Sequence, residues 1–210
     1  MRSDEVMRLG PVIAVVVIKD AGHAEPLARA LAAGGIKAVE ITLRSPAALE
    51  AIRRAVDAVP EAVVGAGTVL SPRDLQAVTE AGAAFAVSPG ATPSLLDAAR
   101  GGAVPLLPGV ASATELMVAL ERGYDRFKLF PAEAVGGRSL LKGLAGPFAE
   151  ARFCPTGGIT RDNAQSYLDL PNVLCVGGSW VAPEAMMAAA DWEGIERLAR
   201  EASTGLRAGD

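Results

Sequence analysis

The sequence contains little histidine, cysteine and aromatic side chain, and each shortage narrows the possible functions. The single histidine, His23, argues against a histidine-rich metal site, although a site built from oxygen ligands alone stays open. The two cysteines, Cys154 and Cys175, lie in strand-like apolar runs, so we expect buried, reduced thiols in a reducing compartment. Basic residues number 20 and acidic residues 24, and the net charge of -4 argues against nucleic acid as the main partner.

A long hydrophobic run is also missing. The N-terminal run "PVIAVVVI" at 11–18 is shorter than the ~20 residues that a membrane helix needs, and the acidic residues before it do not suit a signal peptide. We therefore expect a cytoplasmic protein with no membrane partner. Half of the 210 residues are hydrophobic, so the chain can bury a sizeable core, and we expect one domain that covers residues 1–210.

Strand-like runs and helix-like segments alternate along the chain. Eight strand-like runs are each followed by a helix-like segment, at 12–18, 38–43, 62–69, 84–90, 104–110, 126–132, 151–158 and 173–179. Ser45, Ser71 and Thr92 each precede a proline and predict three of the helix starts. This α/β pattern is most simply a closed (β/α)8 TIM barrel, with an extra N-terminal helix within the first ten residues and a fraying tail at 202–210. A doubly wound open sheet is the alternative.

Alternation within two strand-like runs directs charged side chains into the barrel. In the second run the apolar side chains belong against the helices, so Glu40 and Arg44 point inward or lie at the barrel mouth. In the sixth run the same rule directs Lys128 into the interior, between the outward-facing Phe127 and Leu129. Barrel interiors are usually filled with branched apolar residues, which favours a functional role, and a purely structural ion pair between Lys128 and Glu40 is the alternative.

A lysine in a barrel interior suggests covalent chemistry. A poorly solvated, neutral amine attacks carbonyl carbons, and the resulting Schiff base accepts electrons from a breaking bond. The lysine needs an acid/base partner, and Glu40 is the best candidate because His23 is expected at the surface.

Two glycine pairs provide a second signal. They end the seventh and eighth strand-like runs, in "CPTGGIT" and "CVGGSW". In many barrels the loops after these two strands bind phosphate through backbone N–H groups, and glycine lets the backbone approach the anion closely.

Six motifs in series resemble those of the 2-keto-3-deoxy-6-phosphogluconate (KDPG) aldolases, which are related to 4-hydroxy-2-oxoglutarate aldolase; the motifs are "VEITLR", "VGAGTVL", "FAVSPG", "FKLFPAE", "RFCPTGGI" and "VLCVGGSW". The resemblance implies a class I, Schiff-base enzyme of the Entner–Doudoroff pathway. It also implies a homotrimer of (β/α)8 barrels that uses no metal or other cofactor.

The resemblance assigns roles to individual residues. Lys128 falls on the Schiff-base lysine and Glu40 on the general acid/base. The expected substrate-binding residues are Arg44 and Thr68 at the carboxylate, Pro89 and Phe130 at the pocket wall, and Thr156, Gly157, Gly158, Gly178 and Ser179 at the phosphate end.

The implied reaction cleaves KDPG to pyruvate and D-glyceraldehyde 3-phosphate. A sister aldolase that acts on 4-hydroxy-2-oxoglutarate or on 2-keto-3-deoxy-6-phosphogalactonate is the nearest alternative. More distant alternatives are a barrel isomerase for sugar phosphates and a non-catalytic sensor of a phosphorylated ligand, neither of which needs a nucleophilic lysine.

Overall fold

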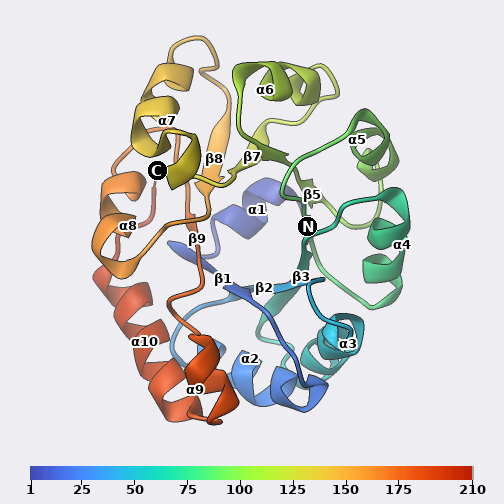
Figure 1. Ribbon diagram of the computed structural model, residues 1–210, viewed down its shortest axis with the longest axis vertical. Helices are drawn as coiled ribbons and strands as arrows, with labels where there is room; N and C mark the ends of the chain where they lie inside the picture. The colour runs from blue at the N-terminus through green and yellow to red at the C-terminus, as the bar shows by residue number, and fades with distance from the viewer. Residues whose placement is uncertain (210) are drawn as a thin grey trace.

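The computed structural model describes residues 1–209, and strands occur in all eight predicted runs (Figure 1). The strands are β1 (Val12–Val16), β2 (Ala38–Thr42), β3 (Val63–Gly67), β4 (Ala86–Val87), β5 (Leu106–Leu107), β6 (Gly109–Val110), β7 (Arg126–Leu129), β8 (Arg152–Pro155) and β9 (Val176–Gly178). The fifth run contains both β5 and β6, because Pro108 between them has no backbone N–H to donate.

The strands close into a ring. All pairs are parallel, in one sheet with the order β5-β4-β3-β2-β1-β9 and a second with the order β6-β7-β8. Pro108 alone separates β5 from β6, and the bridges Phe153↔Val173 and Thr156↔Gly177 join β8 to the run that contains β9. The expected α/β barrel is therefore confirmed, with a discontinuous fifth strand.

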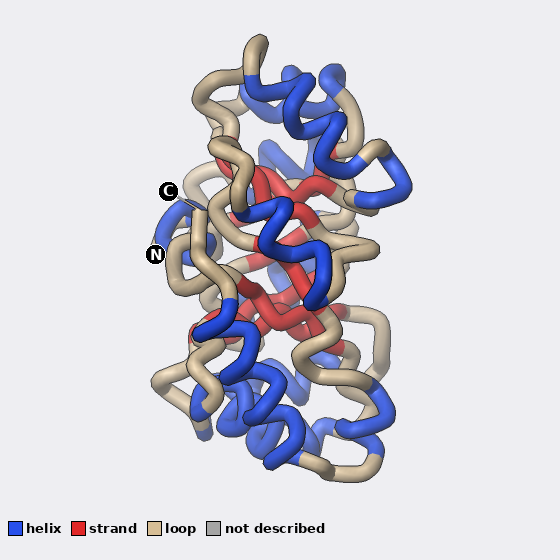
Figure 2. The backbone as a smooth tube through the Cα atoms, turned by 90° about the vertical axis from the view of Figure 1, so that its left-hand side faces the viewer, coloured by secondary structure: helices blue, strands red, loops and turns tan. Residues whose placement is uncertain are grey.

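Helices cover the outside of this ring, as the side view shows (Figure 2). They are α2 (Ala24–Ala33), α3 (Ala48–Ala58), α4 (Pro72–Glu80), α5 (Pro93–Ala99), α6 (Ala113–Leu120), α7 (Gly137–Ala145), α8 (Arg161–Leu168), α9 (Glu184–Ala188) and α10 (Trp192–Gly205), with short 3-10 helices η1 (Ala21–His23) and η2 (Glu133–Val135). The expected N-terminal helix is α1 (Ser3–Met7), which lies behind the ring in Figure 1.

Two of the three predicted helix starts are confirmed. The Ser71 hydroxyl accepts the N–H of Asp74 at the start of α4, and the Thr92 hydroxyl accepts the N–H of Leu95 at the start of α5. The prediction at Ser45 is wrong: α3 begins at Ala48, and the Ser45 hydroxyl instead donates to the carbonyl of Ile18.

The prediction that the tail at 202–210 frays is also wrong for the described residues 202–209. Helix α10 continues to Gly205, the Ser203 hydroxyl donates to the carbonyl of Gly34, and the N–H of Gly209 donates to the carbonyl of Leu174. Residue 210 lies outside the described residues.

The apolar side chains form two clusters, one outside the ring and one inside it. Val39, Ile41, Phe127 and Leu129 belong to the outer cluster, between strands and helices, as the alternation predicts. The inner cluster fills the barrel and contains Val6, Met7, Ile13, Ala38, Phe85, Val87, Leu107, Cys154, Leu174 and Cys175. Helix α1 thus closes one end of the barrel with Val6 and Met7, and both cysteines are buried and free, as expected.

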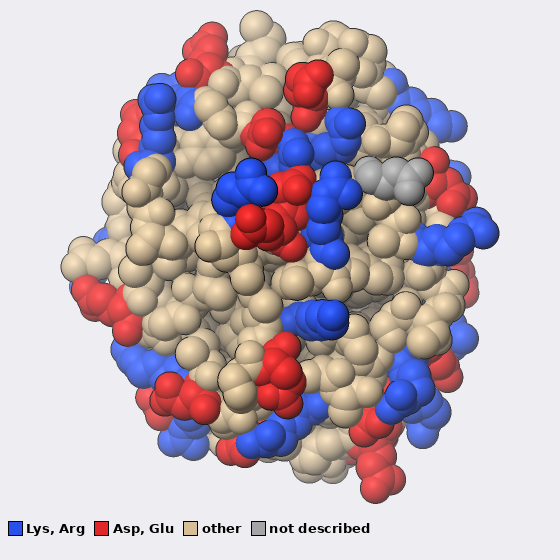
Figure 3. Space-filling view, turned by 180° about the vertical axis from the view of Figure 1, so that it is seen from behind, with Lys and Arg blue, Asp and Glu red and all other residues tan. Residues whose placement is uncertain are grey.

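Charged side chains gather on the face that carries α1, where acidic and basic groups lie side by side (Figure 3). A cavity of about 610 Å³ on this face is lined by Arg2, Arg100, Arg122 and Arg126 among others. Along residues 1–209 we find no helix with the length and apolar character that crossing a membrane requires.

Candidate active site

A lysine and a glutamate meet inside the barrel. Lys128 Nζ lies 3.0 Å from Oε1 and 3.4 Å from Oε2 of Glu40. Their side chains are only 6% and 3% exposed. Lys128 lies on β7, in the sixth predicted run, and Glu40 lies on β2, in the second. The two side chains therefore meet across the ring. The predicted positions are confirmed, while the catalytic roles stay predictions.

Two glycines of β3 make room for side chains inside the barrel, and one of them borders this pair. Glu40 lies opposite Gly65 in the β2–β3 register, and Thr42 lies opposite Gly67. A Cβ atom on Gly67 would overlap the Glu40 carboxylate, and one on Gly65 would lie 2.5 Å from the Phe85 ring. Gly67 therefore lets the carboxylate lie against the β3 backbone, while Gly65 makes room for the Phe85 ring.

Lys128 has an apolar surrounding that excludes water from its amine. It lies between Gly109 of β6 and Cys154 of β8 in the register, and Nζ lies 5.3 Å from the centroid of the Phe130 ring. A Cβ atom on Gly109 would overlap the backbone of Pro89, so the loop after β4 packs closely beside the strand next to Lys128. Phe130 is thus brought to the lysine and Pro89 to the neighbouring strand, while their role as the pocket wall stays a prediction.

Arg44 follows β2 and is exposed at the barrel rim. Its Nε donates to the Thr42 hydroxyl at 3.2 Å, and this hydroxyl donates to the carbonyl of Val16 at 2.9 Å. No carboxylate in residues 1–209 forms an ion pair with Arg44, which leaves the guanidinium available for an anionic ligand. Sequence reasoning missed Thr42 as a support, although Thr42 shares the inward face of β2 with Glu40.

Thr68 follows β3 in a strained backbone conformation. Its φ of 61° lies in the left-handed region, which is rare for a β-branched residue and costs about 1–3 kcal/mol. The neighbouring backbone holds it there, because the carbonyl of Gly67 accepts the N–H of Leu43 and the N–H of Val69 donates to the carbonyl of Val87. Such strain is concentrated at functional sites, so it supports a role for Thr68 at the rim.

The loop after β8 presents two backbone N–H groups. Gly157 and Gly158 have φ values of 95° and 79°, which glycine adopts without strain, and their lack of side chains lets an anion approach the two N–H groups closely; we call these two N–H groups the nest. Neither N–H has a protein partner within residues 1–209. The carbonyls of Thr156, Gly157 and Gly158 are all occupied; their donors are the N–H groups of Ala132 and Glu133 and the side-chain amide of Asn163.

The loop after β9 lies beside this nest. The bridge Thr156↔Gly177 aligns the two strand ends, and a Cβ atom on Gly177 would overlap the buried Thr156 hydroxyl. A Cβ atom on Gly178 would overlap the Trp180 ring, and Ser179 is exposed at the rim. The five residues predicted for the phosphate end are thus gathered in one place, and their ligand stays a prediction.

His23 does not belong to this group. It is half-buried in η1, where its ring packs edge-on against Trp192 with centroids 5.4 Å apart. The sequence predicts a surface position for His23, whereas the structure places its ring half-buried against Trp192.

The predicted site residues come from the carboxyl ends of several strands, the end at which barrel proteins place their chemistry. The fold and the buried pair together define a class, the α/β barrels with an interior lysine positioned to attack a carbonyl carbon. Residues 3–198 match the family described as KDPG and KHG aldolase, and the chain belongs to that family.

Individual relatives agree with this membership. The KHG/KDPG aldolase of Escherichia coli K12 is 51% identical over 98% of this chain and 96% of its own length. The 2-dehydro-3-deoxy-phosphogluconate aldolase of Zymomonas mobilis is 52% identical over 98% of this chain and 97% of its own. The crystal structure of the KDPG aldolase of Legionella pneumophila, with pyruvate captured as a covalent carbinolamine, covers 97% of this chain and 99% of its own with a TM-score of 0.96 and 47% identity.

Proposed function

We propose that the protein is a class I, Schiff-base aldolase, a carbon–carbon lyase that cleaves KDPG to pyruvate and D-glyceraldehyde 3-phosphate. The observation that carries this function is the contact between Lys128 Nζ and Glu40 inside the barrel of a chain from this family. The covalent pyruvate in the Legionella relative and the name of the Zymomonas relative support it.

In the proposed mechanism Lys128 attacks the C2 ketone of the substrate. Glu40 takes a proton from the ammonium, which makes Nζ nucleophilic, and returns it to the carbinolamine hydroxyl so that water leaves and the iminium forms. The distance of 3.0 Å between Nζ and Oε1 is within hydrogen-bond reach, as direct transfer requires.

Bond cleavage then uses the iminium as the electron acceptor. Glu40 removes the proton of the C4 hydroxyl, the C3–C4 bond breaks, and its electron pair forms an enamine on the Lys128 side. D-Glyceraldehyde 3-phosphate leaves. Protonation of C3 and hydrolysis of the imine release pyruvate and restore the amine, so the cycle is balanced without an external reductant or oxidant.

Residues around the pair hold the two ends of the substrate. Arg44 binds the carboxylate, helped by Thr68, and Pro89 and Phe130 form the wall beside the reacting carbons. Thr156, Gly157, Gly158, Gly178 and Ser179 hold the phosphate. This division follows from the exposed guanidinium at one side of the rim and the unoccupied N–H groups at the other.

A second activity is the cleavage of 4-hydroxy-2-oxoglutarate, which the double name of the Escherichia coli relative, KHG/KDPG aldolase, supports. This substrate shares the 2-keto acid that Lys128 attacks but lacks the phosphate. Turnover of KDPG, its phosphogalactonate epimer and 4-hydroxy-2-oxoglutarate by the same preparation ranks the substrates.

The resemblance further supports a metal-independent homotrimer that acts as one domain of residues 1–210 in the cytoplasmic Entner–Doudoroff pathway. Activity that survives EDTA and sedimentation as a trimer are the expected results. Loss of activity in EDTA would favour a metal-dependent aldolase instead.

The decisive test is borohydride reduction in the presence of pyruvate, followed by peptide mass mapping. We expect a pyruvyl adduct on Lys128 and none in Lys128→Arg, while Lys142→Arg, a change at an exposed lysine of α7, leaves the adduct in place. Glu40→Gln should bind pyruvate and turn over slowly. An adduct elsewhere, or no adduct, refutes the mechanism.

A further inference from the structure

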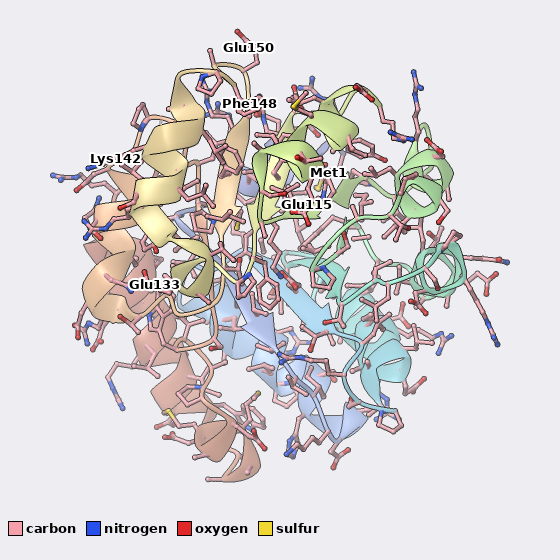
Figure 4. The ribbon with its side chains drawn as sticks, turned by 45° about the horizontal axis from the view of Figure 1, so that its top comes forward. Met1, Glu115, Glu133, Lys142, Phe148 and Glu150 are labelled. Atoms are coloured by element: carbon pink, nitrogen blue, oxygen red, sulfur yellow. The ribbon has the colours of Figure 1, made fainter. Side chains whose placement is uncertain are left out.

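A buried tyrosine and a glutamate meet behind the nest after β8. Tyr167 of α8 is fully buried, and its hydroxyl donates to Oε1 of Glu133 in η2. Burial, followed by this hydrogen bond and the charge of Glu133, raises the pKa of Tyr167, so the hydroxyl remains a donor at neutral pH. Figure 4 shows Glu133 near the start of α7, while Lys142 of α7 points away into solvent.

Two left-handed glycines make space for this contact. A Cβ atom on Gly137 would lie 2.5 Å from the Tyr167 hydroxyl, and one on Gly158 would lie 2.5 Å from Cγ of Glu133. Their φ values are 51° and 79°. Because each glycine borders one partner, both the hydroxyl and the glutamate stem occupy space that another residue type would fill.

The glutamate is tied directly to the nest. The N–H of Glu133 donates to the carbonyl of Gly157 at 3.1 Å, and its Cβ and Cγ pack on Gly158. The side-chain amide of Asn163 fixes the next carbonyl, that of Gly158, at 3.0 Å. The Gly157 carbonyl and the Gly158 N–H belong to one trans peptide and point opposite ways, so the bond from Glu133 directs the Gly158 N–H away from η2. The Gly157 N–H is oriented in the same way through the Thr156 carbonyl, which accepts the N–H of Ala132.

The negative charge of the Glu133 carboxylate must be kept away from a bound phosphate. A free negative charge beside a nest that holds a phosphate would repel the ligand, and the hydroxyl of Tyr167 keeps the charge on the α8 side. Glu133 also lines an outer cavity of about 440 Å³ together with Arg138 and Lys142, which offset its charge there.

We propose that Glu133 and Tyr167 form a positioning pair that sets the affinity for the phosphorylated end of the substrate by holding the Gly157–Gly158 loop. This inference rests on the proposed phosphate end of the aldolase site. Neither residue touches the reacting carbons, so the pair affects binding of the phosphate and leaves the chemistry at Lys128 alone.

The test compares a phosphate-dependent with a phosphate-independent step. Tyr167→Phe should raise the KM for KDPG about tenfold, the size expected for one hydrogen bond to a charged group, with little change in kcat. The exchange of pyruvate methyl hydrogens in deuterated water, followed by NMR, needs the imine but no phosphate and should proceed at the wild-type rate. Glu133→Ala should behave like Tyr167→Phe, and Glu133→Gln, which keeps an acceptor oxygen, should recover most of the loss.

Tyr124→Phe is the matched control, because the Tyr124 hydroxyl also makes a partly buried hydrogen bond, to the carbonyl of Leu96 at 2.7 Å, away from the nest. The inference is overturned if Tyr167→Phe raises the KM no more than Tyr124→Phe does, or if it slows pyruvate exchange as much as KDPG cleavage. A wild type that exchanges pyruvate but cleaves no KDPG would contradict the proposed function. The affinity of the variants for inorganic phosphate, measured by calorimetry, would then decide the inference alone.

Discussion

At the scale of single residues, glycine at position 67 leaves the space in which the Glu40 carboxylate contacts Lys128. Gly67→Ala places a methyl group where the Glu40 carboxylate lies. We expect the carboxylate to move off Lys128 Nζ and turnover to fall at least about a hundredfold, the usual contribution of general acid/base catalysis. Overpacking should also cost about 1–3 kcal/mol of stability, so steady-state kinetics and thermal unfolding are measured together.

Gly143→Ala is the control for this change. Gly143 lies in α7, and a Cβ atom there would meet nothing within 4 Å. Removing a glycine from a helix interior should stabilise the protein by about 0.5–1 kcal/mol and leave turnover unchanged. If Gly67→Ala retains wild-type turnover, the alignment of Glu40 against β3 does not matter for catalysis.

The site shows which residue positions a sequence can predict. Period-two alternation sufficed to place Lys128 and Glu40 inside the barrel, because burial of the opposite face fixes the register of a strand. Alternation also put Thr42 on the inward face, but not its double hydrogen bond to Val16 and Arg44, because that depends on the spacing of neighbouring strands. The pair of Tyr167 and Glu133 was out of reach for the same reason, since 34 residues separate its members.

At the scale of elements, α1 is joined to the barrel by charge as well as by apolar packing. The Asp4 carboxylate lies 2.6 Å from Nε of Arg126 on β7 and 3.1 Å from Nε of Arg8. Burial raises the pKa of Asp4, but the hydrogen bonds and charges of Arg126 and Arg8 outweigh burial and lower it below the ordinary 3.8.

This lowered pKa predicts how stability depends on pH. The ionised Asp4 stabilises the folded state at pH values above 3.8, and the contribution is lost as the pH falls through the lower, folded-state pKa. Asp4→Asn should therefore cost about 1 kcal/mol at pH 7 and progressively less in acid, measured by urea unfolding across pH. Glu5→Gln, a change at a neighbouring exposed carboxylate that pairs with Arg2 of the same segment, is the control and should have a smaller effect at pH 7.

The ends of helices could be predicted where the capping residue binds its own helix. The prediction failed where that residue hydrogen-bonds a distant segment instead. Ser71 and Thr92 cap their own helices, so sequence identified both starts. Ser45 has the same local pattern but finds the carbonyl of Ile18 on another unit, and α3 starts later. The end of α10 was underestimated because Ser203 binds the carbonyl of Gly34, a contact across 169 residues.

At the scale of the whole molecule, the closed ring makes the barrel interior one cooperative unit. Residues from α1 and from the strand runs of several units share the inner cluster, and the fifth run and two bridges join the two sheets into the ring. Cys154 and Cys175 are 2% and 0% exposed in that cluster. The hydrogen bond to Cys154, followed by burial, raises the pKa of the Cys175 thiol, which further disfavours the reactive thiolate.

Thiol labelling therefore reports on global unfolding of this barrel. We expect both cysteines to resist a disulfide reagent in the native protein and to react at one common rate that follows the free energy of unfolding in urea. Met7→Ala opens a cavity where α1 closes the barrel, costs about 2–5 kcal/mol, and should accelerate both reactions by more than about tenfold. Met117→Ala, a change at an exposed methionine of α6, should leave both rates as they are. If Met7→Ala instead speeds labelling of one cysteine at unchanged global stability, α1 opens independently and the interior is not a single unit.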